Sequence, residues 1–122
     1  MDFHAEKPIY QQIVDYAFAK ILSDEWNPGQ RIPSVRELAA QMSVNTHTVL
    51  KAYDYLQLHE ILIVKRGMGY FLADDARDKV NKSRREAFLT ITAPAFFKEM
   101  KLLGLTIEEV LAANEAVYKP IV

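Results

Sequence analysis

Apolar residues recur at helical spacing near the start of the chain. One row repeats every fourth residue and a second row follows it one position later: Ile9, Ile13, Ala17 and Ile21, then Tyr10, Val14, Phe18 and Leu22. This wide stripe predicts an amphipathic helix over residues 8–24. Pro8 suits its first turn, and Pro28 and Gly29 break the pattern after it. Trp26, in that turn, is expected to fill the core beneath it.

Two shorter helices are predicted next. Ser34 and Glu37 have the spacing of a capping box, so a helix is expected to begin there and to stop at Ser43. Asn45 is a suitable cap for the following helix. The inward i, i+3, i+4 and i+7 positions of that helix are apolar: Val49, Ala52, Tyr53 and Leu56.

The opposite face of the same helix is mostly polar. Its outward positions, with Thr48 at their edge, are Thr46, His47, Leu50, Lys51 and Asp54. A helix N-terminus has unpaired amides and a partial positive charge, which suit a phosphate. Small polar side chains there also let a helix approach base edges closely. An ordinary solvated helix face is the alternative.

A β-hairpin is predicted directly after this helix. Residues 61–66 and residues 70–72 favour strands, and Gly67 and Gly69 between them permit the positive φ of a tight turn. Helix, turn, helix and hairpin in this order form a winged helix-turn-helix. The second helix of that module fits the major groove of DNA.

After the hairpin the chain turns polar and then helical. Helix-compatible sequence runs through Thr92, and Pro94 must kink or restart the helix. A further helix over residues 95–103 is expected to end at Gly104, and a second capping box at Thr106 to begin the last helix. Apolar residues are assigned to that last helix: Ile107, Val110, Leu111 and Val117.

The tail has more large apolar side chains than about forty-five residues in two or three helices can bury. These side chains are Phe88, Ile91, Phe96, Phe97, Met100, Leu103 and Leu111. Packing against the tail's own domain is one solution, but a two-fold dimer is favoured because one patch then serves both partners. A small inducer at the dimer seam, among Phe96, Phe97 and Met100, is less favoured than core packing.

These patterns predict a mainly α fold with a small β-hairpin. The expected domains are a winged helix-turn-helix over residues 1–75 and a helical dimerisation tail over residues 76–122.

Composition excludes several classes of protein. Half of the 122 residues are hydrophobic and a quarter are charged, which is typical of a folded domain. No apolar run approaches the length of about eighteen residues that a membrane span needs. The absence of cysteine makes a reducing, cytoplasmic setting the default expectation. There is no cysteine, and the three histidines lack metal-ligand spacing. No metal site, cofactor or enzymatic activity is therefore predicted.

Charge is distributed unevenly. A net charge of −1 argues against a protein that binds nucleic acid indiscriminately. Between Arg31 and Arg66, however, five basic residues stand against three acidic ones, and four of the five fall at turns, helix starts or the hairpin tip. A phosphate is reachable from such positions. On charge alone, a normally solvated surface is an equally good interpretation.

Four motifs occur in order: Pro8-Ile9-Tyr10-Gln11-Gln12-Ile13, Pro28-Gly29-x-Arg31-Ile32-Pro33-Ser34-x-Arg36-Glu37-Leu38-Ala39, Val44-Asn45-x-x-Thr48-Val49 and Arg66-Gly67-x-Gly69-x-Phe71. Together they resemble the GntR family of bacterial transcription regulators over about residues 7–72. The tail sequence Phe97-x-Glu99-Met100-x-x-Leu103-Gly104-Leu105-Thr106 is similar to the YtrA subfamily, in which the tail dimerises. The resemblance implies a homodimeric repressor, often encoded beside a membrane-transporter operon that it controls.

The resemblance also implies a double-stranded DNA operator as partner. It matches Arg36 to an arginine that touches DNA, and it puts Arg66 and Gly67 at a wing tip near the minor groove. Leu50 stands where many relatives have an arginine that reads guanine, and Glu60 replaces a common helix-ending glycine. The full set expected at DNA is Arg31, Ser34, Arg36, Asn45, Thr46, His47, Thr48, Leu50, Lys51, Lys65, Arg66 and Gly67. The rival interpretation is a winged-helix protein-interaction module without DNA binding, which predicts binding that is insensitive to salt.

Overall fold

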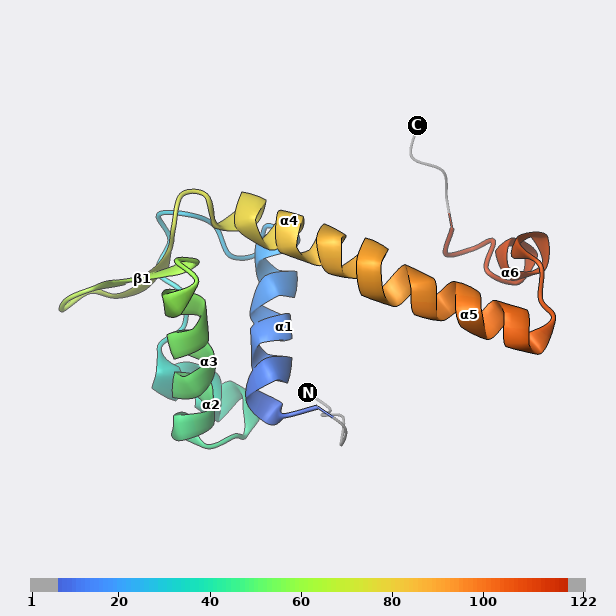
Figure 1. Ribbon diagram of the computed structural model, residues 1–122. Helices are drawn as coiled ribbons and strands as arrows, with labels where there is room; N and C mark the ends of the chain where they lie inside the picture. Colours follow the sequence, from blue (N-terminus) through green and yellow to red (C-terminus); the bar gives the residue numbers. More distant parts are fainter. Residues whose placement is uncertain (1–6, 119–122) are drawn as a thin grey trace. The chain divides into compact units, whose positions relative to one another are not determined.

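The computed structural model describes residues 7–118 and opens with three helices (Figure 1). They are α1 (Ile9–Leu22), α2 (Val35–Met42) and α3 (Thr46–Leu58). α3 packs against both α1 and α2, so the apolar faces predicted from the sequence meet in one core. Within residues 7–118, no helix has the length and apolar character needed to cross a lipid bilayer.

Local caps set the starts of α2 and α3. Ser34 Oγ accepts the amide of Glu37 at 3.1 Å, and Glu37 Oε1 accepts the amide of Ser34 at 3.1 Å, which is a reciprocal capping box. α2 ends at Ser43, whose φ of 56° is left-handed. Asn45 Oδ1 then accepts the amide of His47 at 2.7 Å and starts α3. Both predicted helix starts are confirmed.

The inward face of α3 is sealed. Four of its residues have no exposed surface: Val49, Ala52, Tyr53 and Leu56. The ring of Tyr53 packs edge to face on Tyr70 with centroids 4.9 Å apart, and its hydroxyl donates to the Pro33 carbonyl at 2.7 Å. Burial raises the pKa of the Tyr53 hydroxyl well above its ordinary value, so this group stays a donor. Trp26 packs at the rim of the core, edge-on to Tyr16 and partly exposed.

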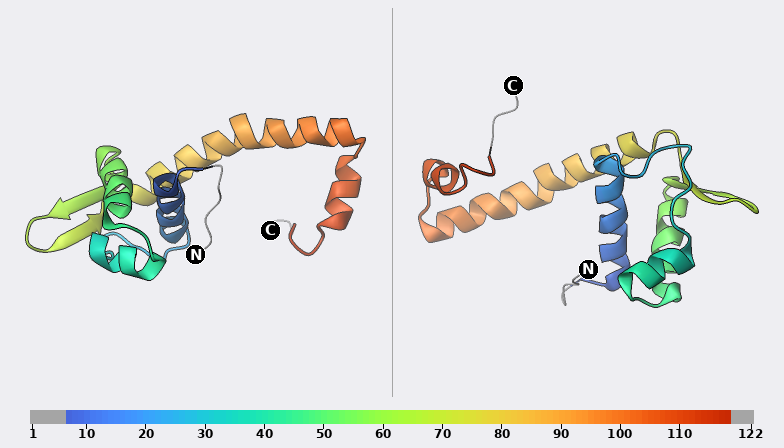
Figure 2. Two further views of the ribbon diagram at one scale, coloured as in Figure 1. Left: turned by 90° about the horizontal axis from the view of Figure 1, so that it is seen from below. Right: turned by 180° about the vertical axis from the view of Figure 1, so that it is seen from behind.

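The predicted hairpin consists of β1 (Leu62–Lys65) and β2 (Gly69–Leu72), paired antiparallel (Figure 2). A third segment, which no local sequence pattern predicts, joins this sheet. Arg31 forms an isolated β-bridge with Phe71, which attaches the loop before α2 to the second strand. The wing and the helix-turn-helix are therefore joined by backbone as well as by side chains.

The first turns of α4 (Ala76–Ala87) belong to the first compact unit. Ala76 and Val80 have no exposed surface and complete the core of the winged helix-turn-helix. The predicted domain boundary follows residue 75, and the two compact units meet between residues 83 and 84. The start of α4 groups with the first unit because it covers part of the core.

Two basic side chains fasten α4 to the preceding elements. Arg77 Nη1 donates to the Leu22 carbonyl at 2.6 Å and lies 3.0 Å from the Asp24 carboxylate. The Lys79 ammonium donates to the Glu60 carbonyl at 3.1 Å. Glu60 has a φ of 60°, a conformation that glycine adopts easily, so Lys79 supports the turn at which the sequence lacks a glycine.

The second unit contains the π-helix η1 (Phe88–Thr92), α5 (Ala93–Leu103) and α6 (Ile107–Ala113). Pro94 is the second residue of α5, which begins directly after η1, and Thr92 keeps helical angles of φ −69° and ψ −50°. A π-helical turn shifts the backbone hydrogen bonds, and this accommodates a proline that cannot donate one. The expected disturbance at Pro94 is therefore a widened helical segment.

α5 and α6 have the predicted termini with one exception. Gly104 ends α5 with a φ of 67°, and a reciprocal capping box at Thr106 starts α6. The expectation that Val117 belongs to the last helix is wrong, because α6 ends at Ala113. The Asn114 side chain donates to the Val110 carbonyl at 2.8 Å, a local bond that competes with continuation of the helix.

We expect Tyr53→Phe to lower the free energy of unfolding by about 1 kcal/mol, because it removes the hydroxyl bond to Pro33 and leaves that carbonyl unpaired. Chemical denaturation followed by circular dichroism measures this loss. Tyr55→Phe is the matched control, since Tyr55 lies on the same helix and is 38% exposed. Equal stability of the two variants would contradict the structural role given to the Tyr53 hydroxyl.

Candidate nucleic-acid interface

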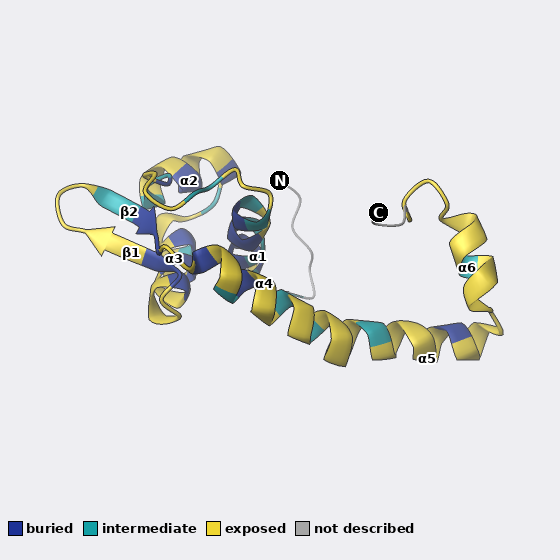
Figure 3. Ribbon diagram, turned by 90° about the horizontal axis from the view of Figure 1, so that it is seen from above, coloured by how far each residue is buried: buried dark blue, intermediate teal, exposed yellow. Residues whose placement is uncertain are grey.

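The outward face of α3 is accessible at the positions predicted from its periodicity. Thr46, His47, Leu50 and Lys51 are exposed, and Thr48 is partly buried at the edge. The buried seam lies on the other side of the same helix, as the burial colours of Figure 3 indicate. The N-terminal half of α3 therefore presents a continuous surface whose side chains are not used by the core.

The cap of α3 limits what its N-terminus can bind. Asn45 Oδ1 accepts the His47 amide, and the Asn45 carbonyl accepts the Thr48 amide at 3.1 Å. Of the first three helical amides, only that of Thr46 has no partner within the described residues. The expected attraction for a phosphate thus depends on one amide and the helix dipole, which is less than the sequence analysis assumed.

Aromatic rings position the two lysines of the expected interface. The Lys51 ammonium lies 4.1 Å from the ring centroid of Tyr10 on α1, and the Lys65 ammonium lies 4.4 Å from that of Phe71. Such cation–π contacts favour one location for each charge while leaving it exposed to solvent. Tyr10 is a functional candidate that the sequence analysis missed, because its contact with Lys51 is distant in sequence.

The start of α2 carries two arginines in different situations. Arg31 Nη2 lies 3.2 Å from Glu37 Oε1, whereas Arg36 is exposed and has no ion pair or hydrogen bond among residues 7–118. The Ser34 amide and then the Ser34 hydroxyl, together with the charge of Arg31, lower the pKa of Glu37. Glu37 therefore stays ionised at neutral pH, and a phosphate at Arg31 must compete with it.

The wing tip is a tight turn with an exposed cation. The Met68 amide donates to the Lys65 carbonyl at 2.8 Å, and Gly67 and Gly69 have φ values of 77° and 115°. Arg66, beside Gly67, is exposed. Replacing the Gly69 hydrogen with a Cβ would put that atom 3.1 Å from Arg31 Nε, so the Arg31 side chain crosses the strand at this glycine.

All twelve residues expected at DNA lie in the first unit, at three places: the start of α2 with the loop before it, the start of α3, and the wing. The tail residues lie in the second unit. Six of the seven expected dimerisation residues are exposed by 39–68%: Phe88, Ile91, Phe96, Phe97, Leu103 and Leu111. Met100 differs, because only 8% of it is exposed.

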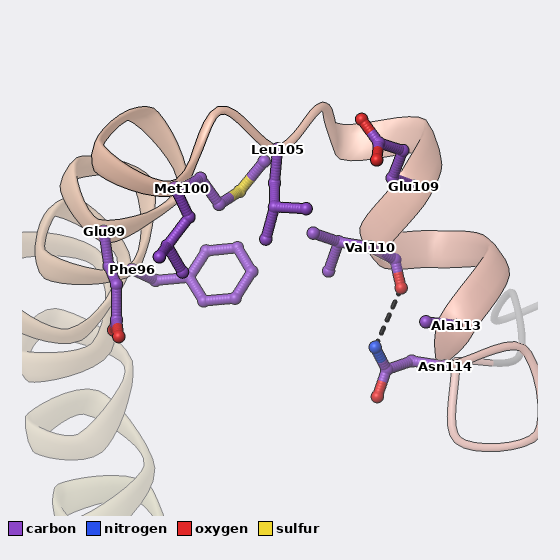
Figure 4. Close-up of a pocket in the computed structure, with 9 residues that line it drawn as sticks. Phe96, Glu99, Met100, Leu105, Glu109, Val110, Ala113 and Asn114 are labelled. Atoms are coloured by element: carbon purple, nitrogen blue, oxygen red, sulfur yellow. Dashed lines mark hydrogen bonds between the residues drawn. The ribbon is translucent and has the colours of Figure 1, made fainter.

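Met100 lies in an apolar groove between α5 and α6 (Figure 4). The groove has a volume of about 300 Å³, and Phe96 and Leu105 also line it. Val110 faces them from α6, where its carbonyl accepts the Asn114 side chain. Met100 thus helps to pack α5 on α6, while the other six expected dimerisation residues remain exposed.

Comparison with known proteins identifies the first unit. Residues 9–72 match the family described as "Bacterial regulatory proteins, gntR family". The chain belongs to the GntR family. It is 38% identical over 115 residues to the uncharacterised HTH-type transcriptional regulator YhcF of Bacillus subtilis, covering 89% of this chain and 88% of that protein. It is 36% identical over 77 residues to the HTH-type transcriptional repressor YtrA of the same organism, covering 63% of this chain and 59% of that repressor.

Solved structures agree with this assignment. A GntR family transcriptional regulator from Listeria monocytogenes has a TM-score of 0.76 and 32% identity, covering 95% of this chain and all of that one. The DNA-binding domain of AraR, solved in complex with operator ORR3, has a TM-score of 0.53 and 32% identity, covering 60% of this chain and 86% of that one.

The GntR chain is therefore a DNA-binding transcription regulator with a winged helix-turn-helix and C-terminal helices. The resemblance stated from the sequence, including its YtrA-like character, is confirmed. The expectation that the protein is not an enzyme agrees with the family and with its relatives, which are transcriptional regulators.

We expect Gly69→Ala to destabilise this GntR domain more than Gly67→Ala. A side chain at either φ is strained by about 1–3 kcal/mol, but only at Gly69 does the new Cβ also meet Arg31, since nothing lies within 4 Å at Gly67. Thermal unfolding of both variants measures the difference. Equal losses would show that Arg31 does not pack against the wing as described.

Proposed function

We propose that the protein is a sequence-specific repressor that binds a pseudo-palindromic operator as a homodimer. The observation that carries this proposal is α3, whose inner face is fully buried while its N-terminal outer face is accessible to solvent. A helix of this kind docks in a major groove in helix-turn-helix proteins. The similarity to the AraR domain bound to its operator supports the same use here.

Contacts are divided between positioning and sequence preference. Arg31, Arg36, Lys51 and Lys65 are proposed to meet phosphates, which fixes the protein on the duplex. Base edges are proposed to meet α3 from Asn45 to Leu50, with Arg66 and Gly67 at the minor groove. The expected partner of Ser34 is also a phosphate. The two recognition helices of a dimer should then lie about one duplex turn apart, roughly 34 Å.

The tail is proposed to hold the two subunits together. Five of its apolar residues are exposed by 39–68% within one chain: Phe88, Ile91, Phe97, Leu103 and Leu111. Two copies of this set of residues complement each other in a two-fold dimer. Domains are accordingly proposed as residues 1–75 for DNA binding and residues 76–122 for dimerisation, with the start of α4 shared structurally.

The relatives support a proposal for the cellular role. The match to a protein named as a transcriptional repressor favours repression over activation. Like the YtrA subfamily, the protein is proposed to act in the cytoplasm and to control a transporter operon. Operator DNA is the proposed partner, and a small-molecule effector at the dimer seam is a secondary proposal that rests on the α5–α6 groove.

We expect Arg36→Ala to weaken operator binding at least several-fold without lowering the melting temperature, because one phosphate or base contact is commonly worth about 1–3 kcal/mol. Fluorescence anisotropy with a selected duplex at several salt concentrations measures both affinity and slope. The slope of log affinity against log salt should also become shallower by about 0.9, the loss of one phosphate contact.

Lys101→Ala is the control for this change, since it removes the same charge from an exposed position in the second unit. It should bind like the wild type. If Arg36→Ala bound the operator with wild-type affinity, Arg36 would not be part of the interface. Binding that does not respond to salt at all would favour the protein-interaction module over the DNA-binding repressor.

We expect Leu103→Glu to convert the dimer to a monomer, because it puts a charge into the proposed apolar interface. Leu103 is 65% exposed in one chain, so the substitution leaves the subunit fold intact. Sedimentation velocity measures the change. Val117→Glu is the control, since Val117 is 84% exposed and lies beyond α6. A Leu103→Glu protein that remains dimeric would place the interface elsewhere.

A further inference from the structure

Leu50 has an unusual place on the recognition helix. It is 38% exposed, although Val49 and the other apolar residues of the inner seam are fully buried. An isolated exposed leucine needs no explanation, but this one lies in the middle of the face proposed to meet DNA. It follows His47 by three positions and Thr46 by four, so the three side chains share one helix face.

The groups around Leu50 are poor in side chains that form paired hydrogen bonds to a base. From Thr46 to Asp54 the sequence has no Arg, Asn or Gln. Asn45 has an amide, but its Oδ1 already accepts the His47 amide at 2.7 Å, which ties this side chain to the helix cap. Paired recognition of adenine needs both atoms of such an amide, so Asn45 would have to share its oxygen between the cap and the base. The Lys51 ammonium, in turn, is held over the Tyr10 ring at 4.1 Å.

What this face offers to base edges is therefore hydroxyl groups, one imidazole and the isobutyl group of Leu50. Among the groups that base pairs present in the major groove, the C5-methyl of thymine is the apolar one. We propose that Leu50 reads thymine through this methyl group, so that each operator half-site has a T·A pair facing Leu50. The inference rests on the proposed operator binding and names a base for it.

The size of the effect follows from burial. Contact between the thymine methyl and Leu50 removes about one methyl group from water, which corresponds to an affinity difference of about threefold to fivefold. Uracil differs from thymine only by lacking that methyl group. Replacing one thymine at a time with uracil therefore isolates the contact without changing any hydrogen-bonding group.

The experiment uses the full chain and a duplex that it selects from a random pool. Each thymine of one half-site is replaced in turn by uracil, and affinity is measured by fluorescence anisotropy. One replacement is expected to weaken binding of the wild type by about threefold to fivefold. Leu50→Ala is expected to bind the thymine and uracil forms of that position equally.

Leu58→Ala is the matched control, because Leu58 is 79% exposed and lies on the same helix beyond the proposed interface. It should keep the wild-type preference for thymine. Leu50→Arg is a second variant that should shift the selected base to guanine, since arginine pairs with guanine O6 and N7. This variant keeps the proposal testable where Leu50→Ala binds too weakly to measure.

If no thymine-to-uracil replacement changed the affinity of the wild-type protein, the assignment of Leu50 would be overturned. Uracil sensitivity that persists in Leu50→Ala would overturn it as well, and both results leave operator binding intact. A wild-type protein that selects no duplex would overturn the operator-binding function and this inference together. The two failures are therefore distinguishable.

Discussion

The rest of the structure depends on one constraint: one face of α3 must be buried in the core, and the opposite face must remain exposed to solvent. Tyr53 meets this constraint because it has both an aromatic ring and a hydroxyl in a fully buried place. The ring packs on Tyr70 of β2, and the hydroxyl donates to Pro33 before α2. The helix cannot rotate about its axis without breaking one of these contacts. The direction in which Thr46, His47 and Leu50 face is thus fixed from the opposite side of the helix.

The charges near this helix are held in place to different degrees. Lys51 and Lys65 lie over aromatic rings, so less side-chain entropy is lost when a phosphate orders them. Arg31 is also held, but by the carboxylate of Glu37, which a phosphate must displace. Arg36 has no such competitor among residues 7–118. The basic residues thus fall into three kinds. Lys51 and Lys65 are positioned by aromatic rings, Arg31 is paired with a carboxylate, and Arg36 is accessible.

Features that depend on neighbours in sequence could be predicted, and features that depend on distant contacts could not. The capping boxes at Ser34 and Thr106 and the Asn45 cap follow from residue type at fixed spacing, and the inner seam of α3 follows from periodicity. The β-bridge from Arg31 to Phe71 and the Lys51–Tyr10 contact join segments far apart in the chain, so no local pattern marks them. The packing of the start of α4 on the core of the first unit is likewise a contact between distant segments. Whether Val80 completes a core depends on the exposed edge of that core, which the sequence of α4 does not encode.

Val117 shows the reverse case, because a local side-chain bond from Asn114 competes with a helix that periodicity alone would have continued.

The proposed dimer would account for operator binding by a chain whose net charge is slightly negative. Because the whole chain has a net charge of −1, a single copy gains little from non-specific attraction to DNA, and its affinity must come from a few directed contacts. Linking two such domains makes the second contact intramolecular and raises the overall affinity by about 10²–10⁴ without any new contact surface. The exposed apolar residues of the tail, such as Phe97 and Leu103, supply a surface for that link. They lie in the second unit, away in sequence from every residue proposed to meet DNA, so dimerisation and base recognition can vary independently.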